Sequence, residues 1–63
     1  MAQAERYKTQ GNAALQANNY DDAIDLYTKA IALNPNSEVY FSNRSAAYAA
    51  LGRFREALDD AQV

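Results

Sequence analysis

The stretches that decide the fold are residues 7–27, YKTQGNAALQANNYDDAIDLY, and residues 41–61, FSNRSAAYAALGRFREALDDA, which share one pattern at an offset of 34 residues. At this offset large aromatic residues fall on aromatic residues, and small residues fall on small ones. The matching pairs are Tyr7 with Phe41, Gly11 with Ser45, Ala13 with Ala47, Tyr20 with Phe54, Ala23 with Ala57, Ile24 with Leu58 and Asp25 with Asp59. A fixed period of this length predicts a repeat architecture, in which each unit packs against its neighbour.

The first repeat is predicted to be a helical hairpin. Residues 3–17 are rich in helix formers, and apolar residues recur at helical spacing over 20–33. Asn18 and Asn19 separate the two segments, and Asn19 is placed to cap the second helix. Pro35 ends that helix, because proline disfavours the helical conformation of the residue before it.

The second repeat is predicted to follow the same plan. Ser37 is placed to cap a third helix, with Glu38 in its first turn, and Gly52 suits the left-handed position just after its end. A fourth helix is expected from about Phe54 to Val63. No segment shows the alternation typical of a strand, so the predicted fold is all-α, with two antiparallel helical hairpins.

Small residues are expected where the two helices of a hairpin touch. Gly11 is predicted to face Ala23, and Ser45 to face Ala57, which gives the mid-helix glycine a packing role despite its low helix propensity. The aromatic residues expected to fill the space between the hairpins are Tyr7, Tyr20, Tyr27, Phe41 and Phe54. Tyr40 is the least constrained aromatic residue, and we expect it to be exposed.

Composition excludes several classes of function. The chain has 63 residues, no Cys, no His and a net charge of −2. It therefore has no disulfide, no thiolate or imidazole metal ligand and no His or Cys for catalysis, so neither an enzyme nor a cofactor is expected. Clustered basic residues for nucleic-acid binding are absent, and no apolar run is long enough for a signal peptide or a membrane span. We expect a cytoplasmic protein without nucleic-acid or membrane partners.

The pattern resembles the tetratricopeptide repeat, a motif of 34 residues. The matching residues are Tyr7, Gly11, Tyr20, Ala23, Tyr27, Ala30 and Pro35 in the first repeat and Phe41, Ser45, Tyr48, Phe54 and Ala57 in the second. The first repeat departs from the motif at Ala14, where a tyrosine is usual. The resemblance implies a fragment of a right-handed α-solenoid, with one repeat at about 4–37 and an incomplete second repeat at about 38–63 that lacks a capping helix.

A narrower resemblance lies in the polar residues. AERYKTQGNAAL (4–15) and SNRSAAY (42–48) are similar to the first module of the Hsp-organising co-chaperone family, and the small glutamine-rich co-chaperones are similar as well. Lys8, Asn12 and Asn43 stand where this type of repeat has a carboxylate clamp, whose remaining Lys and Arg lie on a third repeat beyond this chain. The resemblance implies binding of acidic C-terminal Glu-Glu-Val-Asp peptides of heat-shock chaperones of the seventy- and ninety-kilodalton classes.

The chemistry of these residues is consistent with an acidic ligand. Lys8 and Asn12 are four residues apart, so they point within ~40° of each other on a helix. With Asn43 they offer a positive charge and amide donors to a carboxylate. The expected floor of this peptide-binding surface is Leu15, Ala46 and Ala49. The acidic residues are expected mainly on the second helices of the hairpins, away from it.

Simpler interpretations of the same residues remain open. Lys8 alone is typical of a solvated lysine, and Asn12 alone of a helix surface. Arg44 is expected to form a structural pair or to cover the convex side. The apolar face made by Phe54, Ala57, Leu58 and Ala61 has no following helix to cover it. The alternative function is therefore a structural fragment that self-associates through this face, by exchange of hairpins or otherwise, and binds no peptide.

Overall fold

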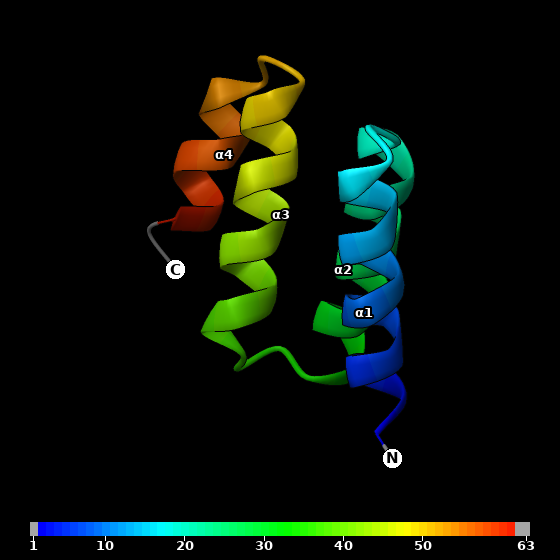
Figure 1. Ribbon diagram of the computed structural model, residues 1–63. Coiled ribbons are helices and arrows are strands. Elements are labelled where there is room, and N and C mark those ends of the chain that lie inside the picture. The colour runs from blue at the N-terminus through cyan, green and yellow to red at the C-terminus, as the bar shows by residue number, and fades with distance from the viewer. Residues whose placement is uncertain (1, 62–63) are drawn as a thin grey trace.

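The computed structural model describes residues 2–61 and confirms the all-α prediction for that part of the chain. Its helices are α1 (Gln3–Gln16), α2 (Tyr20–Leu33), α3 (Glu38–Ala50) and α4 (Phe54–Ala61). Figure 1 shows them as two antiparallel hairpins, α1 with α2 and α3 with α4. Helix α2 packs against α3 and so joins the hairpins, whereas α1 touches α3 only slightly. In the described range, no helix is both long and apolar enough to span a membrane.

The two hairpin turns are built in the same way. Asn18 (φ 65°) and Gly52 (φ 78°) both adopt the left-handed conformation, and they are separated by the repeat period. In each turn the left-handed residue and its successor donate backbone hydrogen bonds to the last turn of the preceding helix, which is the Schellman arrangement. These bonds run from Asn18 to Leu15 (3.1 Å), Asn19 to Ala14 (2.9 Å), Gly52 to Ala49 (3.0 Å) and Arg53 to Tyr48 (2.9 Å). The role of Gly52 was predicted, and Asn18 fills the same role because asparagine tolerates this conformation.

The predicted N-cap residues of α2 and α3 and the predicted end of α2 lie at the expected positions. Asn19 and Ser37 are the N-cap residues of α2 and α3, although neither side chain makes a capping hydrogen bond. Asn34 has φ −144° and ψ 81°, so the chain leaves the helical conformation directly before Pro35. The caps therefore set the helix boundaries without contributing a side-chain bond.

The core lies along α2, in two clusters. One consists of Ala23, Ile24, Tyr27 and Ala47, and the other of Ala4, Ala30 and Tyr40. The expectation that Tyr40 is exposed was wrong, since only 2% of its surface is accessible. Tyr40 is buried because α3 brings it against Ala4 of α1 and Ala30 of α2, in the corner where three helices meet.

Gly11 lies on α1 directly against the ring of Tyr27 on α2. A Cβ atom at this position would be 2.6 Å from Cε1 of Tyr27, a distance that no side chain tolerates. The packing role of Gly11 is confirmed, although its nearest neighbour is the ring of Tyr27 and not Ala23. In the second hairpin the Ser45 hydroxyl donates to the Ala57 carbonyl (2.7 Å), which confirms that these two small residues face each other.

Two predictions about α4 were wrong. Phe54 does not fill the space between the hairpins, because 69% of it is exposed at the first residue of the helix. Ala57 was expected on an uncovered face, but it is 8% exposed and packs toward α3 beneath Ser45. Leu58 (58% exposed) and Ala61 are on the surface as expected. The predicted end of the helix at residues 62–63 lies outside the described residues.

Arg44 ties the two hairpins together. Its guanidinium donates two hydrogen bonds of 2.7 Å to the carboxylate of Asp60 on α4 and one of 3.1 Å to the hydroxyl of Thr28 on α2. It also lies 5.5 Å from the ring centre of Phe41 and 5.8 Å from that of Tyr48. The hydrogen bonds with Asp60 raise the pKa of Arg44 further above its ordinary value. The structural pair expected for Arg44 is therefore present, and it joins α2, α3 and α4.

Candidate functional site

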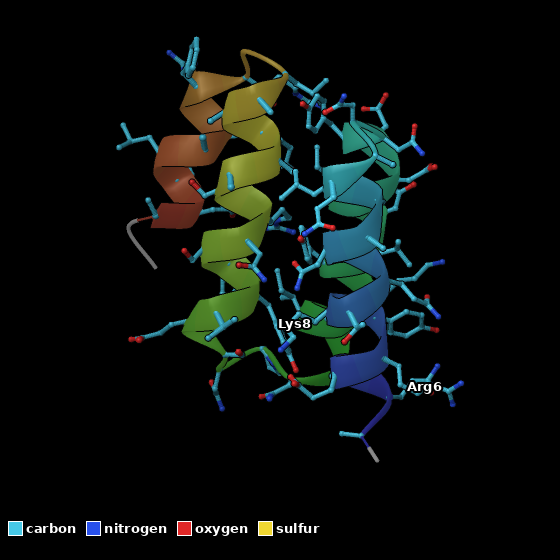
Figure 2. All side chains as sticks on the ribbon, in the orientation of Figure 1. Arg6 and Lys8 are labelled. Carbon is cyan, nitrogen blue, oxygen red and sulfur yellow. The ribbon has the colours of Figure 1, made fainter. Side chains whose placement is uncertain are left out.

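Lys8 lies on the face of α1 that is turned toward α3. Figure 2 shows its side chain extending into the space between these helices, whereas Arg6 extends away on the opposite side of α1. The Lys8 side chain is 26% exposed, so it is partly covered but accessible to a ligand. The two basic residues of α1 therefore have different surroundings, although they are only two positions apart.

The structure brings Asn12 and Asn43 together from different helices. The Asn43 side-chain amide on α3 donates to Oδ1 of Asn12 on α1 at 3.4 Å, and the hydroxyl of buried Tyr27 donates to the same oxygen. Oδ1 of Asn12 therefore accepts two hydrogen bonds, and the amide nitrogen of Asn12 makes none to the described residues. An amide group held in this way can donate to a carboxylate.

A carboxylate that sequence reasoning missed sits beside Lys8. Oε1 of Glu5 lies 3.0 Å from Nζ of Lys8, and Oε2 accepts a hydrogen bond from the hydroxyl of Tyr40. The hydrogen bond from Tyr40, and then that from Lys8, lower the pKa of Glu5 below its ordinary value of 4.5. The same contact raises the pKa of Tyr40. The spacing of three residues between Glu5 and Lys8 was a usable signal, because residues at this spacing are neighbours on a helix.

Glu5 is an exception to the expected charge distribution. The acidic residues lie mainly on the second helices of the hairpins, as expected, but this one lies on α1 in contact with Lys8. In the free protein, Lys8 is therefore part of a neutral pair and not an isolated positive charge.

The expected floor residues fall into two groups. Leu15 is half-buried and packs against the core cluster of Ala23, Ile24, Tyr27 and Ala47, so most of it belongs to the core. Ala46 and Ala49 are exposed on α3. Three hollows of the surface lie away from these residues: one borders the first hairpin turn, and two others border Phe41. The candidate site is thus a polar face between α1 and α3, with two exposed alanines beside it.

The helical hairpin of α1 and α2, with its aromatic and small positions, recurs 34 residues later in α3 and α4. The sequence profile of the family described as "Tetratricopeptide repeat" matches residues 4–37, which is more than half of the chain. The chain belongs to the tetratricopeptide repeat family. Repeats of this family stack into a solenoid whose surface serves for binding, and the family is not one of enzymes.

Relatives with tetratricopeptide repeats match nearly all of this chain. It is 53% identical to the "Small glutamine-rich tetratricopeptide repeat-containing protein 2" of Mycosarcoma maydis, over 98% of this chain and 18% of that protein. It is 49% identical to "Hsp70-Hsp90 organizing protein 3" of Arabidopsis thaliana, over 94% of this chain and 11% of that protein. The chain thus spans less than a fifth of the length of these curated relatives.

A solved structure has the same fold. The crystal structure of the Sgt2 TPR domain from Aspergillus fumigatus superimposes with a TM-score of 0.95 at 42% sequence identity, over 98% of this chain and 41% of that one. Both groups that the sequence resembled, the small glutamine-rich proteins and the Hsp-organising proteins, are therefore among its relatives.

Proposed function

We propose that this chain is the protein-interaction module of a cytoplasmic co-chaperone, and that it binds the acidic C-terminal peptide of a heat-shock chaperone. The names of its relatives support the class of partner, since one of them is described as an organizing protein for Hsp70 and Hsp90. The donor groups on the face between α1 and α3 support the chemistry of the ligand. A binding role without catalysis also agrees with the lack of any His or Cys in the chain.

The observation that carries the proposal is the meeting of Asn12 with Asn43. These residues are 31 positions apart, and their amide groups are joined by a hydrogen bond on the face to which Lys8 points. Three hydrogen-bonding side chains from two helices therefore border one surface. A mid-helix asparagine on α3 has no advantage for helix formation, so its contact with Asn12 suggests a role for both amides.

Each residue has a definite part in the proposed complex. Lys8 supplies a positive charge to a terminal carboxylate, and such charge-assisted bonds are shorter and stronger than neutral ones. The free amide hydrogens of Asn12 and Asn43 donate to the remaining oxygens of the ligand. Ala46 and Ala49 leave room on α3 for an apolar side chain of the peptide, and the partly exposed Leu15 lies on the neighbouring helix.

The test is a calorimetric titration of the protein with a synthetic peptide that ends in Glu-Glu-Val-Asp. Lys8→Ala is expected to weaken binding about tenfold and Asn43→Ala about three- to tenfold, as typical for loss of a charge-assisted and a neutral hydrogen bond. Arg6→Ala is the matched control, because it removes the same charge from the opposite side of α1. It is expected to change the affinity less than about twofold.

The peptide supplies a second control. The same sequence with an amidated C-terminus lacks the terminal carboxylate and is expected to bind at least about tenfold more weakly. Equal affinity of wild type, Lys8→Ala and Asn43→Ala would remove the clamp proposal, as would the absence of binding by the wild type.

Self-association is a second candidate function, favoured by the surface of α4. Phe54 and Leu58 are one turn apart on this helix and are 69% and 58% exposed. Two such apolar side chains on one face can bury against a second copy of the chain. Sedimentation at dilute concentration tests this candidate: a dimer that Leu58→Glu dissociates supports it, and a well-folded monomer excludes it.

A further inference from the structure

We propose that Glu5 limits the affinity of the peptide site, because it acts as an internal carboxylate that competes with the ligand for Lys8. The inference rests on the function proposed above and names the group that controls its strength. A ligand carboxylate binds Lys8 beside, or in place of, a carboxylate that is already there.

The position of Glu5 is held from both sides. One oxygen lies 3.0 Å from Nζ of Lys8, and the other accepts the hydroxyl of Tyr40, whose side chain is 2% exposed. Because Tyr40 is fixed in the core corner between three helices, its hydroxyl anchors the carboxylate next to the lysine. Glu5 is therefore more than a mobile surface glutamate that meets Lys8 by chance.

Lys8 is engaged by Glu5 but not used up by it. An ammonium group has three donors, and one ion pair in the described structure leaves donors for a second acceptor. A ligand carboxylate can thus approach Lys8, but it then meets the negative charge of Glu5 at the same lysine. The two carboxylates next to Lys8, that of Glu5 and that of the ligand, repel each other, which lowers the affinity for any anionic ligand.

Glu5 weakens the binding of every anionic ligand, and contacts elsewhere on the face offset part of that loss. A single carboxylate gains little by taking the place of Glu5 at Lys8. A terminus that carries a second carboxylate can contact Lys8 and the amide donors of Asn12 and Asn43 at the same time. The wild type is therefore expected to bind even such a terminus more weakly than a protein without the negative charge of Glu5.

The variant that tests the proposal is Glu5→Gln. Glutamine has the same shape and still offers an oxygen to the Tyr40 hydroxyl, so the fold is retained while the negative charge is lost. The matched control is Asp59→Asn, which changes the net charge equally on an exposed residue of α4, a helix that does not touch α1 within the described range. Both variants are titrated with the synthetic peptide that ends in Glu-Glu-Val-Asp.

Glu5→Gln is expected to bind the peptide about three- to fivefold more tightly than the wild type, in the range found for exposed charge pairs. Asp59→Asn is expected to change the affinity less than about 1.5-fold. The gain in affinity should vanish when Lys8→Met is added both to the wild type and to Glu5→Gln, because Glu5 acts through that lysine.

The outcomes separate this inference from the proposed function. Binding by wild type with no gain in Glu5→Gln, or an equal gain in Asp59→Asn, overturns the role of Glu5 and leaves the peptide function standing. If the wild type does not bind the peptide, the proposed function falls, and the role of Glu5 falls with it.

Discussion

The two hairpins share one packing plan, but the leading helices α1 and α3 differ in the face they present. Where α1 carries Glu5, Lys8 and Asn12, the equivalent positions of α3 carry Val39, Ser42 and Ala46. The small and aromatic residues that form the hairpins repeat, whereas these polar residues do not. The difference separates the repeated positions, which form the fold, from the unrepeated polar face of α1, which carries the proposed ligand site.

The hairpins also differ in how their helices are held together. In the first, the ring of Tyr27 covers Gly11, whereas in the second the equivalent residues are Ala61 and Ser45. A hollow of about 350 Å³ lies at this place in the second hairpin, lined by Glu38, Phe41, Ser42, Ser45, Asp60 and Ala61. The ion pair of Arg44 with Asp60 replaces aromatic packing there. One hairpin therefore depends on close apolar contact, and the other on a shielded pair of charges.

The largest effect is expected from breaking the close contact of the first hairpin. Gly11→Val places branched carbon atoms where even a Cβ is 2.6 Å from the fixed ring of Tyr27. We expect a loss of about 3 kcal/mol in the free energy of unfolding, as for severe overpacking of a core. A domain of this size has a total of only about 3–9 kcal/mol, so the loss removes about a third or more of the stability and lowers the urea midpoint strongly. Urea denaturation followed by circular dichroism measures this, and an unchanged midpoint would contradict it.

Breaking the charge pair of the second hairpin should lower the free energy of unfolding less, because Arg44 retains other contacts. Asp60→Ala leaves the guanidinium of Arg44 with Thr28 and the neighbouring rings. The carboxylate is 7% exposed and the arginine side chain 18%, so the expected cost is about 2 kcal/mol, below that of breaking a fully buried pair. Asp59→Ala is the control at an exposed neighbour and should change the free energy of unfolding by less than about 0.5 kcal/mol. Equal effects of the two variants would show that the pair does not hold α3 and α4 together.

The smallest expected effect is on the pH dependence of stability. It can be compared between one glutamate of each hairpin. Tyr40 and Lys8 lower the pKa of Glu5, and Arg53 lowers that of Glu56, both from an ordinary value of 4.5. Each group therefore stabilises the folded state above pH 4.5, and this stabilisation is lost as the pH falls through the lowered pKa. Glu5→Gln and Glu56→Gln should each flatten part of the acid side of a plot of stability against pH. Titration of the two carboxyl groups by NMR checks the sign, and a pKa of Glu5 above 4.5 would contradict it.

Much of this fold follows from residues whose effects are local or periodic. The 34-residue repeat, the break before Pro35 and the left-handed turn at Gly52 depend on spacing and on backbone conformation, and all were predicted. The burial of Tyr40 and the exposure of Phe54 were not predicted, because they depend on how α3 packs against α1 and α2 and how α4 packs against α3. The orientation of these helices cannot be predicted from local sequence rules.

The candidate site shows the same division. The positions of Lys8 and Asn12 on one face of a helix follow from their spacing, and the approach of Asn43 followed from the expected pairing of α1 with α3. The hydrogen bonds from buried tyrosines that hold this face could not be predicted from the sequence. Tyr27 and Tyr40 donate hydroxyls to Asn12 and Glu5 only because their rings lie in the core with their polar ends outward.

The most direct test of the account converts the face of the first hairpin into that of the second. Lys8→Ser with Asn12→Ala places on α1 the residues that α3 has at the equivalent positions. We predict that this double variant keeps its helical content and binds the Glu-Glu-Val-Asp peptide at least about tenfold more weakly in a calorimetric titration. A folded double variant with the affinity of the wild type would contradict the assignment of the polar face of α1 to a ligand.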